Sequence, residues 1–153
     1  MDEPELEGPK GFRSRVHGNG PTPNQNIGAG FTQINFPGVP IYDTLGEFFV
    51  ATSSFRPRRP GWYLLGAQVE YRVGGGLAPQ FVMRLVVGGV TQIARAQFLG
   101  QAGVFMSAQC FTVERLAAGD AVTVEAAFPL APPNGDVVDA TGRASFFVAH
   151  RLS

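Results

Sequence analysis

The chain offers few side chains that could carry out catalysis or hold a transition metal. His17 and His150 are its only histidines, and they lie near opposite ends of the sequence without a third metal-ligating residue nearby. The single cysteine, Cys110, sits in an apolar run, which favours a buried thiol over a reactive nucleophile. The sequence contains no recognisable motif that would place a nucleophile beside its base or pair two catalytic carboxylates. We therefore predict that the protein is not an enzyme.

Three aspartates are candidates for ion binding, and two glycine-rich segments are candidates for phosphate binding. Asp120, Asp136 and Asp139 lie on or near expected loops, where carboxylates could bind calcium, but their spacing does not match an EF-hand. Solvated turn acids are the favoured interpretation. Residues 18–20 and 74–76 are interpreted as turns, because no Gly-Lys-Ser/Thr follows them and no phosphate loop is formed. No cofactor is therefore expected, with calcium as the one open alternative.

A small basic cluster precedes the clearest strand. Arg56, Arg58 and Arg59 lie beside two prolines and could bind an acidic partner, a carboxylated glycan or a phosphate. The favoured interpretation is a solvated loop, or a salt bridge between subunits to an acid such as Glu47 or Asp43. The cluster is the first surface patch to test for ligand binding.

Charge and hydropathy exclude several classes of partner. Twelve basic and twelve acidic residues give a formal net charge of zero, so neither nucleic acid nor an anionic membrane is expected as a partner. Residues 1–11 are expected to form a flexible acidic tail ahead of one domain, residues 12–153. The sequence shows no standard secretion signal and no apolar run of about eighteen residues, so no membrane insertion is expected.

Apolar residues alternate along most of the domain, which predicts half-buried β-strands. The clearest strand is Trp62–Val73, where apolar side chains occupy every second position from Tyr63 onward. Gly88 and Gly89 separate Gln80–Val87 from Val90–Leu99 and predict a two-residue hairpin turn. The other strands are expected at Arg13–His17, Phe31–Phe36, Glu47–Ser53, Val104–Leu116, Val122–Phe128 and Thr141–Leu152.

The connections complete an all-β pattern. Residues 117–120 are expected to close a second hairpin between the strands 104–116 and 122–128. Residues 129–140 are expected to form a long loop, because they contain Pro-Pro-Asn-Gly-Asp. No window favours a helix longer than one turn. About eight to ten short strands separated by turns predict a sandwich or a barrel.

Several motifs occur in a recognisable order. Phe55–Pro57 reads F-R-P, Pro60–Tyr63 reads P-G-W-Y, Leu116–Val122 reads L-A-A-G-D-A-V, and Ser145–Leu152 is a closing aromatic strand. With Phe31–Phe36 and Ile41–Phe48 ahead of them, they resemble the globular head of the C1q family, within the C1q/TNF jelly-roll superfamily. The resemblance covers about Phe12 to Leu152. The chain departs from the family pattern at Val148, where a glycine is usual, and at His150, where an apolar residue is usual.

The resemblance implies a jelly-roll β-sandwich of about ten antiparallel strands that assembles as a homotrimer. Alternation also leaves Val82, Val86 and Ile93 on the nominally outer face of their strands, an apolar excess that contact between subunits would bury. Calcium binding by loop acids also occurs among such heads. The side chains expected to line the trimer interface are Tyr63, Phe146, Phe147, His150 and Leu152.

The expected function is that of a non-enzymatic, homotrimeric binding or structural module whose loops and intersubunit surfaces recognise a protein or a glycan. The first alternative is a decoration or fibre-tip component of a phage-like or other particle. The second is a cupin-type metalloenzyme, which the missing His-x-His and Glu pattern disfavours. The resemblance favours an extracellular or particle-surface location. The fold does not specify the ligand.

Overall fold

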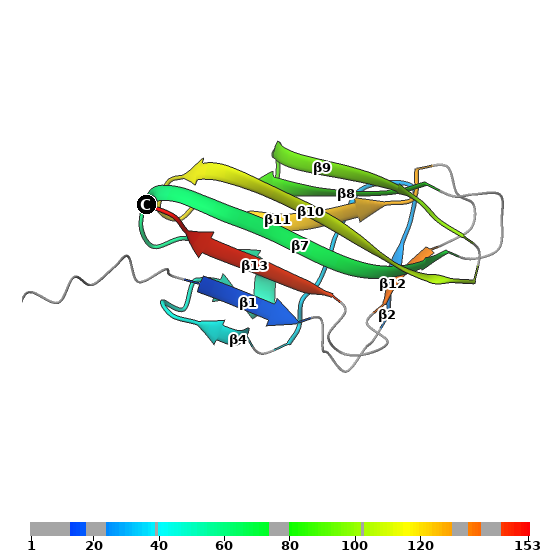
Figure 1. Ribbon diagram of the computed structural model, residues 1–153, viewed down its shortest axis with the longest axis horizontal. Coiled ribbons are helices and arrows are strands. Elements are labelled where there is room, and N and C mark those ends of the chain that lie inside the picture. Colours follow the sequence, from blue (N-terminus) through cyan, green and yellow to red (C-terminus); the bar gives the residue numbers. More distant parts are fainter. Residues whose placement is uncertain are drawn as a thin grey trace, which may run out of the picture.

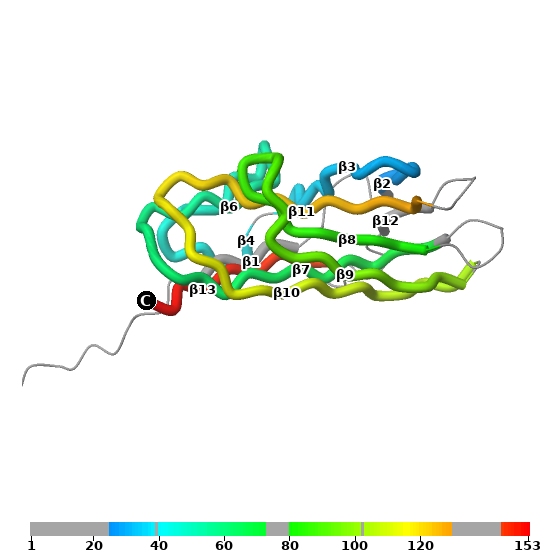
Figure 2. The backbone as a smooth tube through the Cα atoms, turned by 90° about the horizontal axis from the view of Figure 1, so that it is seen from above, coloured from blue at the N-terminus to red at the C-terminus, as the bar shows by residue number. Residues whose placement is uncertain are grey.

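The computed structural model describes residues 13–17, 24–38, 40–73, 80–101, 103–129, 135–138 and 145–153. Two antiparallel sheets pack face to face, and the view in Figure 2 separates them. Sheet A runs in the order β2-β12-β7-β13-β1-β4, and β10 pairs with the other edge of β7 (Figure 1). Its strands are β1 (Arg13–His17), β2 (Asn24–Ile27), β4 (Pro40–Asp43), β7 (Gly61–Val73), β10 (Phe105–Leu116), β12 (Gly135–Val138) and β13 (Phe146–Arg151).

Sheet B runs in the order β5-β6-β11-β8-β9, and β3 also pairs with β11. A short 3-10 turn, η1 (Val50–Thr52), connects β5 to β6. The strands are β3 (Thr32–Gln33), β5 (Phe48–Phe49), β6 (Ser54–Phe55), β8 (Gln80–Val87), β9 (Thr91–Leu99) and β11 (Val122–Ala127).

Aromatic rings fill the space between the two sheets. At one end, Phe55 packs against Tyr63 and Phe147, with ring centroids 5.6 and 6.0 Å away. At the other end, Tyr71 stacks on Phe81 at 4.2 Å. Each of these five side chains is almost fully buried. Aromatic pairs at these distances stabilise the core through their large buried area and their ring contacts.

Backbone hydrogen bonds tie three connections together at one end of the sandwich. The turn between β10 and β11 reaches the segment before β7, because the Gly119 N–H donates to the Pro57 carbonyl at 2.7 Å. The same turn reaches the β8–β9 hairpin, because the Gly88 N–H donates to the Ala121 carbonyl at 2.9 Å. The C-terminus lies at this end too, since the Leu152 N–H donates to the Trp62 carbonyl at 2.7 Å.

The long strands expected from alternation are present. Gln80–Val87 and Arg13–His17 form strands with the expected bounds, and Trp62–Val73, Val90–Leu99 and Val104–Leu116 differ from theirs by one residue. Gly88 and Gly89 both have positive φ, +62° and +73°, as the expected two-residue hairpin turn requires. The closing strand is shorter than expected within the described residues, which resume at Ser145.

Two expected connections are wrong. The strands 104–116 and 122–128 do not form a hairpin, because β10 pairs with β7 in sheet A whereas β11 pairs with β8 in sheet B. The turn between them therefore crosses from one sheet to the other. The expected loop 129–140 contains β12, which pairs with both β2 and β7. The interval Glu47–Ser53 is not one strand, because η1 interrupts it. Residues 1–11, the expected tail, lie outside the described residues.

The apolar excess expected on the outer face of β8 and β9 is also corrected. Val82 and Val86 are buried within the single chain. A bulge places Leu85 opposite Ala94 and Val86 opposite Gln92, so Ile93 has no partner on β8. Ile93 and its neighbour Ala94 both pack against the core as a result. These side chains do not need a second subunit to cover them.

Candidate assembly face and arginine cluster

One face of sheet A is exposed and apolar at the end where β7 begins. The opposite side chains of β7, including Tyr63 and Leu65, belong to the core, so Trp62 and Leu64 point outward. The register places Val113 opposite Leu64, and the neighbouring outward positions of β13 hold Val148 and His150. Four large side chains of this face are about half exposed: Trp62 (48%), Phe111 (47%), Val113 (50%) and Leu152 (45%). We call these outward positions the apolar face.

Phe111 lies directly over Gly66 in the middle of the apolar face. The two residues are register partners on β10 and β7. A Cβ atom built on Gly66 would lie 2.0 Å from Phe111 Cδ1 and 2.1 Å from Cε1, which is closer than real atoms approach. Gly66 therefore allows the ring to lie against the β7 backbone. The Phe111 ring therefore projects little from the sheet at the centre of the apolar face.

The face becomes polar farther along β7. The Gln109 Nε2 group donates to Gln68 Oε1 at 2.6 Å, one row beyond Phe111. Two rows farther, the Arg72 guanidinium lies 5.5 Å from the centroid of the Phe105 ring. The outward surface of sheet A is therefore mainly apolar from Trp62 to Gly66, where Arg115 opposite Trp62 adds one exposed charge, and becomes hydrogen-bonded and charged from Gln68 to Arg72.

The residues expected at a trimer interface divide into two groups. Phe146, His150 and Leu152 lie at outward positions of β13 and its extension, where a neighbouring subunit could contact them. Tyr63 and Phe147 are each 1% exposed and lie between the sheets, so their expected interface position is corrected. Alternation defines two faces of a strand, and these two side chains occupy the face that packs against sheet B.

The arginine cluster lies before β7, and part of it is held in place. The Arg56 guanidinium lies 5.3 Å from the centroid of the Phe49 ring, a cation–π contact, and its Nε donates to Ser54 Oγ at 3.3 Å. The Arg56 N–H donates to the Glu47 carbonyl at 2.8 Å. These contacts fix Arg56 beside Phe49, which remains 46% exposed.

Glu47 holds the backbone of the cluster in place. Its side chain is buried, and its Oε1 accepts a hydrogen bond from the Arg58 N–H at 2.7 Å. The Arg59 carbonyl accepts one from the Tyr63 hydroxyl, also at 2.7 Å. The side chains of Arg58 and Arg59 are exposed. These two hydrogen bonds therefore hold the backbone of the loop, while the side chains of Arg58 and Arg59 are exposed to solvent.

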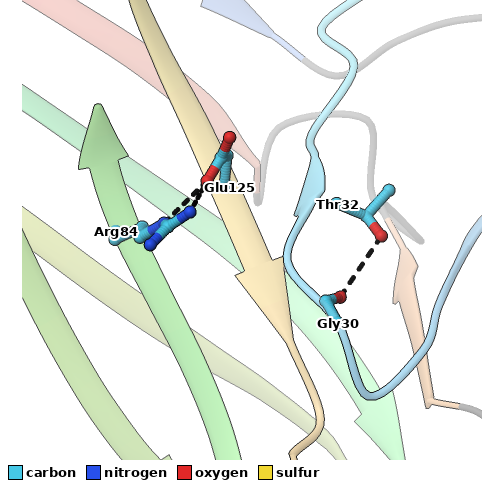
Figure 3. Close-up of polar contacts among 4 residues, drawn as sticks. All are labelled: Gly30, Thr32, Arg84 and Glu125. Carbon is cyan, nitrogen blue, oxygen red and sulfur yellow. Dashed lines mark hydrogen bonds and ion pairs between the residues drawn. The ribbon is translucent and has the colours of Figure 1, made fainter. Parts of the chain in front are cut away.

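A third arginine–phenylalanine contact, which the sequence did not single out, occurs on the outer side of sheet B. Arg84 Nε donates to Glu125 Oε2 at 2.6 Å, and Arg84 Nη2 lies 2.5 Å from the same oxygen (Figure 3). The Arg84 guanidinium lies 3.8 Å from the centroid of the Phe31 ring. The Arg84 guanidinium is thus already paired with a carboxylate. Predicting this ion pair would have required knowing that β8 pairs with β11.

Burial shifts the titration of three core groups. It is the main cause that raises the pKa of Tyr63, followed by the charge of Glu47, and Arg151 opposes the shift. Burial alone raises the pKa of Tyr71. Burial also raises the pKa of the Cys110 thiol, with a smaller opposing hydrogen bond from the Leu85 backbone. A buried thiol with a raised pKa is a poor nucleophile at neutral pH.

The candidate calcium ligands are not brought together where the structure describes them. Asp120 Oδ2 accepts the Ala117 N–H at 2.8 Å and closes the turn before β11. Asp136 lies on β12, where only the backbone is described, and Asp139 lies outside the described residues. Among the described residues, no three histidine, cysteine, aspartate or glutamate side chains form a group suited to a metal ion.

Comparisons with known proteins place the fold. No family model and no curated protein matches the sequence. Among solved structures, the globular domain of zebrafish complement 1qA protein superposes with a TM-score of 0.65 and 15% identity, over 93% of this chain and 98% of that one. The fold is a C1q/TNF-like jelly roll. The Eiger TNF of S. frugiperda also superposes on the jelly roll, with a TM-score of 0.62 and 14% identity, over 94% of this chain and 93% of that one.

At these identities the comparisons establish the jelly roll and not its ligand. No helix in the described part of the chain is long and apolar enough to cross a membrane. Trp62, Phe111 and Val113 are the half-exposed residues of the apolar face that sequence reasoning missed. Their signal was present in the alternation of 62–73 and 104–116, but their neighbours could be known only from the register of β10 on β7.

Proposed function

We propose that the chain is a non-enzymatic binding or structural module that assembles as a homotrimer through the apolar face. The observation that carries the proposal is the presence of four half-exposed large apolar side chains on one sheet face: Trp62, Phe111, Val113 and Leu152. A contiguous exposed patch of this kind marks an interaction surface more often than a solvated one. In a cyclic trimer the contact is heterologous, so the face meets a different surface of the next subunit.

A recognition role is supported by the fold. The two superposed structures come from a complement protein and from a TNF, and both share the sandwich over nearly their whole length. Three copies of one domain would present their loops and the grooves between subunits together, which raises avidity for a protein or glycan ligand. An extracellular or particle-surface location is part of this proposal.

The test is the solution mass of matched variants by light scattering. We expect the wild-type chain to have three times its 16.3 kDa mass. Val113→Glu places a charge on the apolar face and should give a monomer with nearly unchanged melting, since Val113 is half exposed in the single chain. Val90→Glu is the control, because Val90 is 86% exposed at the β8–β9 turn, and it should leave the trimer intact.

Two outcomes contradict the proposal. A wild-type chain that remains monomeric at high concentration would remove the homotrimer altogether. A Val113→Glu variant that keeps the wild-type mass would show that subunits meet elsewhere.

A further inference from the structure

The loop that carries the arginine cluster, residues 56–60, is held at every position. Each of its five residues has a backbone hydrogen bond to a residue outside the loop. In loop order the partners are the Glu47 carbonyl, the Gly119 N–H, the Glu47 carboxylate, the Tyr63 hydroxyl and the Arg151 guanidinium, at 2.8, 2.7, 2.7, 2.7 and 3.1 Å. The loop backbone therefore has little conformational freedom left to lose when a ligand binds, which favours affinity.

This fixed backbone keeps three like charges close together at the surface. The side chains of Arg56, Arg58 and Arg59 are all exposed. In the part of the chain that the structure describes, neither Arg56 nor Arg58 forms an ion pair with a carboxylate. Like charges held near one another repel, and an anion bound across them removes this repulsion. The loop is therefore built to receive an anionic group.

Arg56 is the guanidinium best prepared to bind that group. The Phe49 ring lies against it, and its Nε donates to Ser54 Oγ. Neither contact uses a hydrogen bond from its two terminal amino groups. Two such groups in one plane match the two oxygens of a carboxylate. An arginine already held by stacking also loses less side-chain freedom on binding.

Apolar surface lies next to these cations and narrows the class of ligand. Phe49 is 46% exposed and Val50 is 36% exposed. An inorganic anion would leave this surface unused, whereas the C–H groups of a sugar ring can pack against an aromatic ring, whose face is electron-rich. In a hexuronate or a sialic acid the carboxylate is attached directly to a rigid ring. In an acidic peptide it ends a flexible side chain, which costs more conformational entropy to fix.

We propose that Arg56, Arg58 and Phe49 form a binding site for an acidic sugar. The sugar carboxylate pairs with the terminal amino groups of Arg56, and the sugar ring packs against the exposed part of Phe49. Arg58 donates to a ring hydroxyl. This inference rests on the binding role proposed above and names its ligand class, but it does not require the homotrimer.

The test is calorimetric titration of the full chain with two probes, a hyaluronan hexasaccharide and 3′-sialyllactose. The first carries hexuronates and the second a sialic acid, so the two titrations show which source of the carboxylate the site accepts. We expect at least one to bind, and Arg56→Gln to weaken that binding about tenfold or more, because a charge-assisted pair is lost. Arg56→Lys should also weaken it, because lysine keeps the charge but lacks the planar fork.

The matched control is Arg95→Gln, which removes one exposed charge from β9 and should bind the sugar as the wild type does. Lactose, which has no carboxylate, should not bind. The proposal is overturned if neither acidic sugar binds, if Arg95→Gln weakens binding as much as Arg56→Gln, or if inorganic phosphate binds as tightly as the sugar. Each of these failures would leave the measured solution mass, and so the homotrimer, unaffected. Thermal melting of each variant checks that it is folded.

Discussion

Replacing Gly66 by alanine separates the stability of the single chain from the stability of the proposed trimer. The new Cβ would lie 2.0 Å from Phe111 Cδ1, so the ring must leave its position over β7. The β7 backbone itself tolerates alanine, because Gly66 is not among the residues with positive φ. Phe111 is 47% exposed, so its ring can rotate outward without disturbing the core.

The expected cost to one chain is small. Complete burial of a phenylalanine contributes about 1.5–3 kcal/mol, so the half-buried ring of Phe111 loses about 0.8–1.5 kcal/mol at most. Alanine in place of glycine within a strand returns about 0.5–1 kcal/mol. The free energy of unfolding of the monomer should therefore change by less than about 1 kcal/mol. The proposed trimer should lose far more stability, because the displaced Phe111 ring of each subunit would prevent the close packing of its apolar face.

The assay is light scattering over a range of protein concentrations, together with chemical denaturation. Gly66→Ala should dissociate at concentrations where the wild type stays trimeric. Gly28→Ala is the control, because no atom lies within 4 Å of the position of its Cβ. A Gly66→Ala trimer as stable as the wild type would refute the role of the Phe111 contact. A loss of several kcal/mol from the monomer would refute the estimate that the ring moves freely.

Three further outcomes are expected. Phe147→Ala should lower the free energy of unfolding by about 3–5 kcal/mol, because it leaves a cavity in the core. Phe146→Ala, on the outward side of the same strand, should lower the free energy of unfolding of the monomer by about 1 kcal/mol. Denaturant titration measures both. Burial raises the pKa of Tyr71, so the neutral hydroxyl contributes fully to the free energy of unfolding below about pH 10. This contribution is lost as the pH rises toward the pKa of Tyr71 in the folded chain. Tyr71→Phe should therefore reduce the fall of the unfolding free energy at alkaline pH. Cys110 should react with a thiol reagent at pH 8 about 100-fold more slowly in the folded chain than in denaturant, measured by absorbance.

Local patterns in the sequence predicted the long strands well, because alternation and turn residues depend on neighbours in the chain, whereas of the expected strand Phe31–Phe36 only β3 (Thr32–Gln33) forms. The Gly88-Gly89 turn needs only positive φ at two adjacent residues, and the pair supplies it. Sheet membership depends on contacts between distant residues. β10 and β11 follow each other in sequence, but they pair with β7 and β8 in different sheets. β12 lies in a proline-rich interval that contains Pro-Pro-Asn-Gly-Asp and that composition alone assigns to a loop.

The candidate site was predicted only in part for the same reason. Leu152 and His150 lie at outward positions, where their expected interface role stays a prediction, whereas Tyr63 and Phe147 are buried, because alternation does not say which face of a strand packs inward. Phe111 gains its role from Gly66, which precedes it by 45 positions and meets it only through the register of two strands.

The hydrogen bonds that join the turn at 117–121 to its two neighbours constrain how this end of the protein can change in length. Inserting residues there would move both the Gly119 N–H and the Ala121 carbonyl away from their partners on two other connections. A graft or a natural insertion at this turn would therefore disturb three connections at once, including the loop that carries the arginines. The β8–β9 hairpin tip at Val90 is a better site for a graft, because that side chain is almost fully solvated and extra residues there could project away from the sandwich.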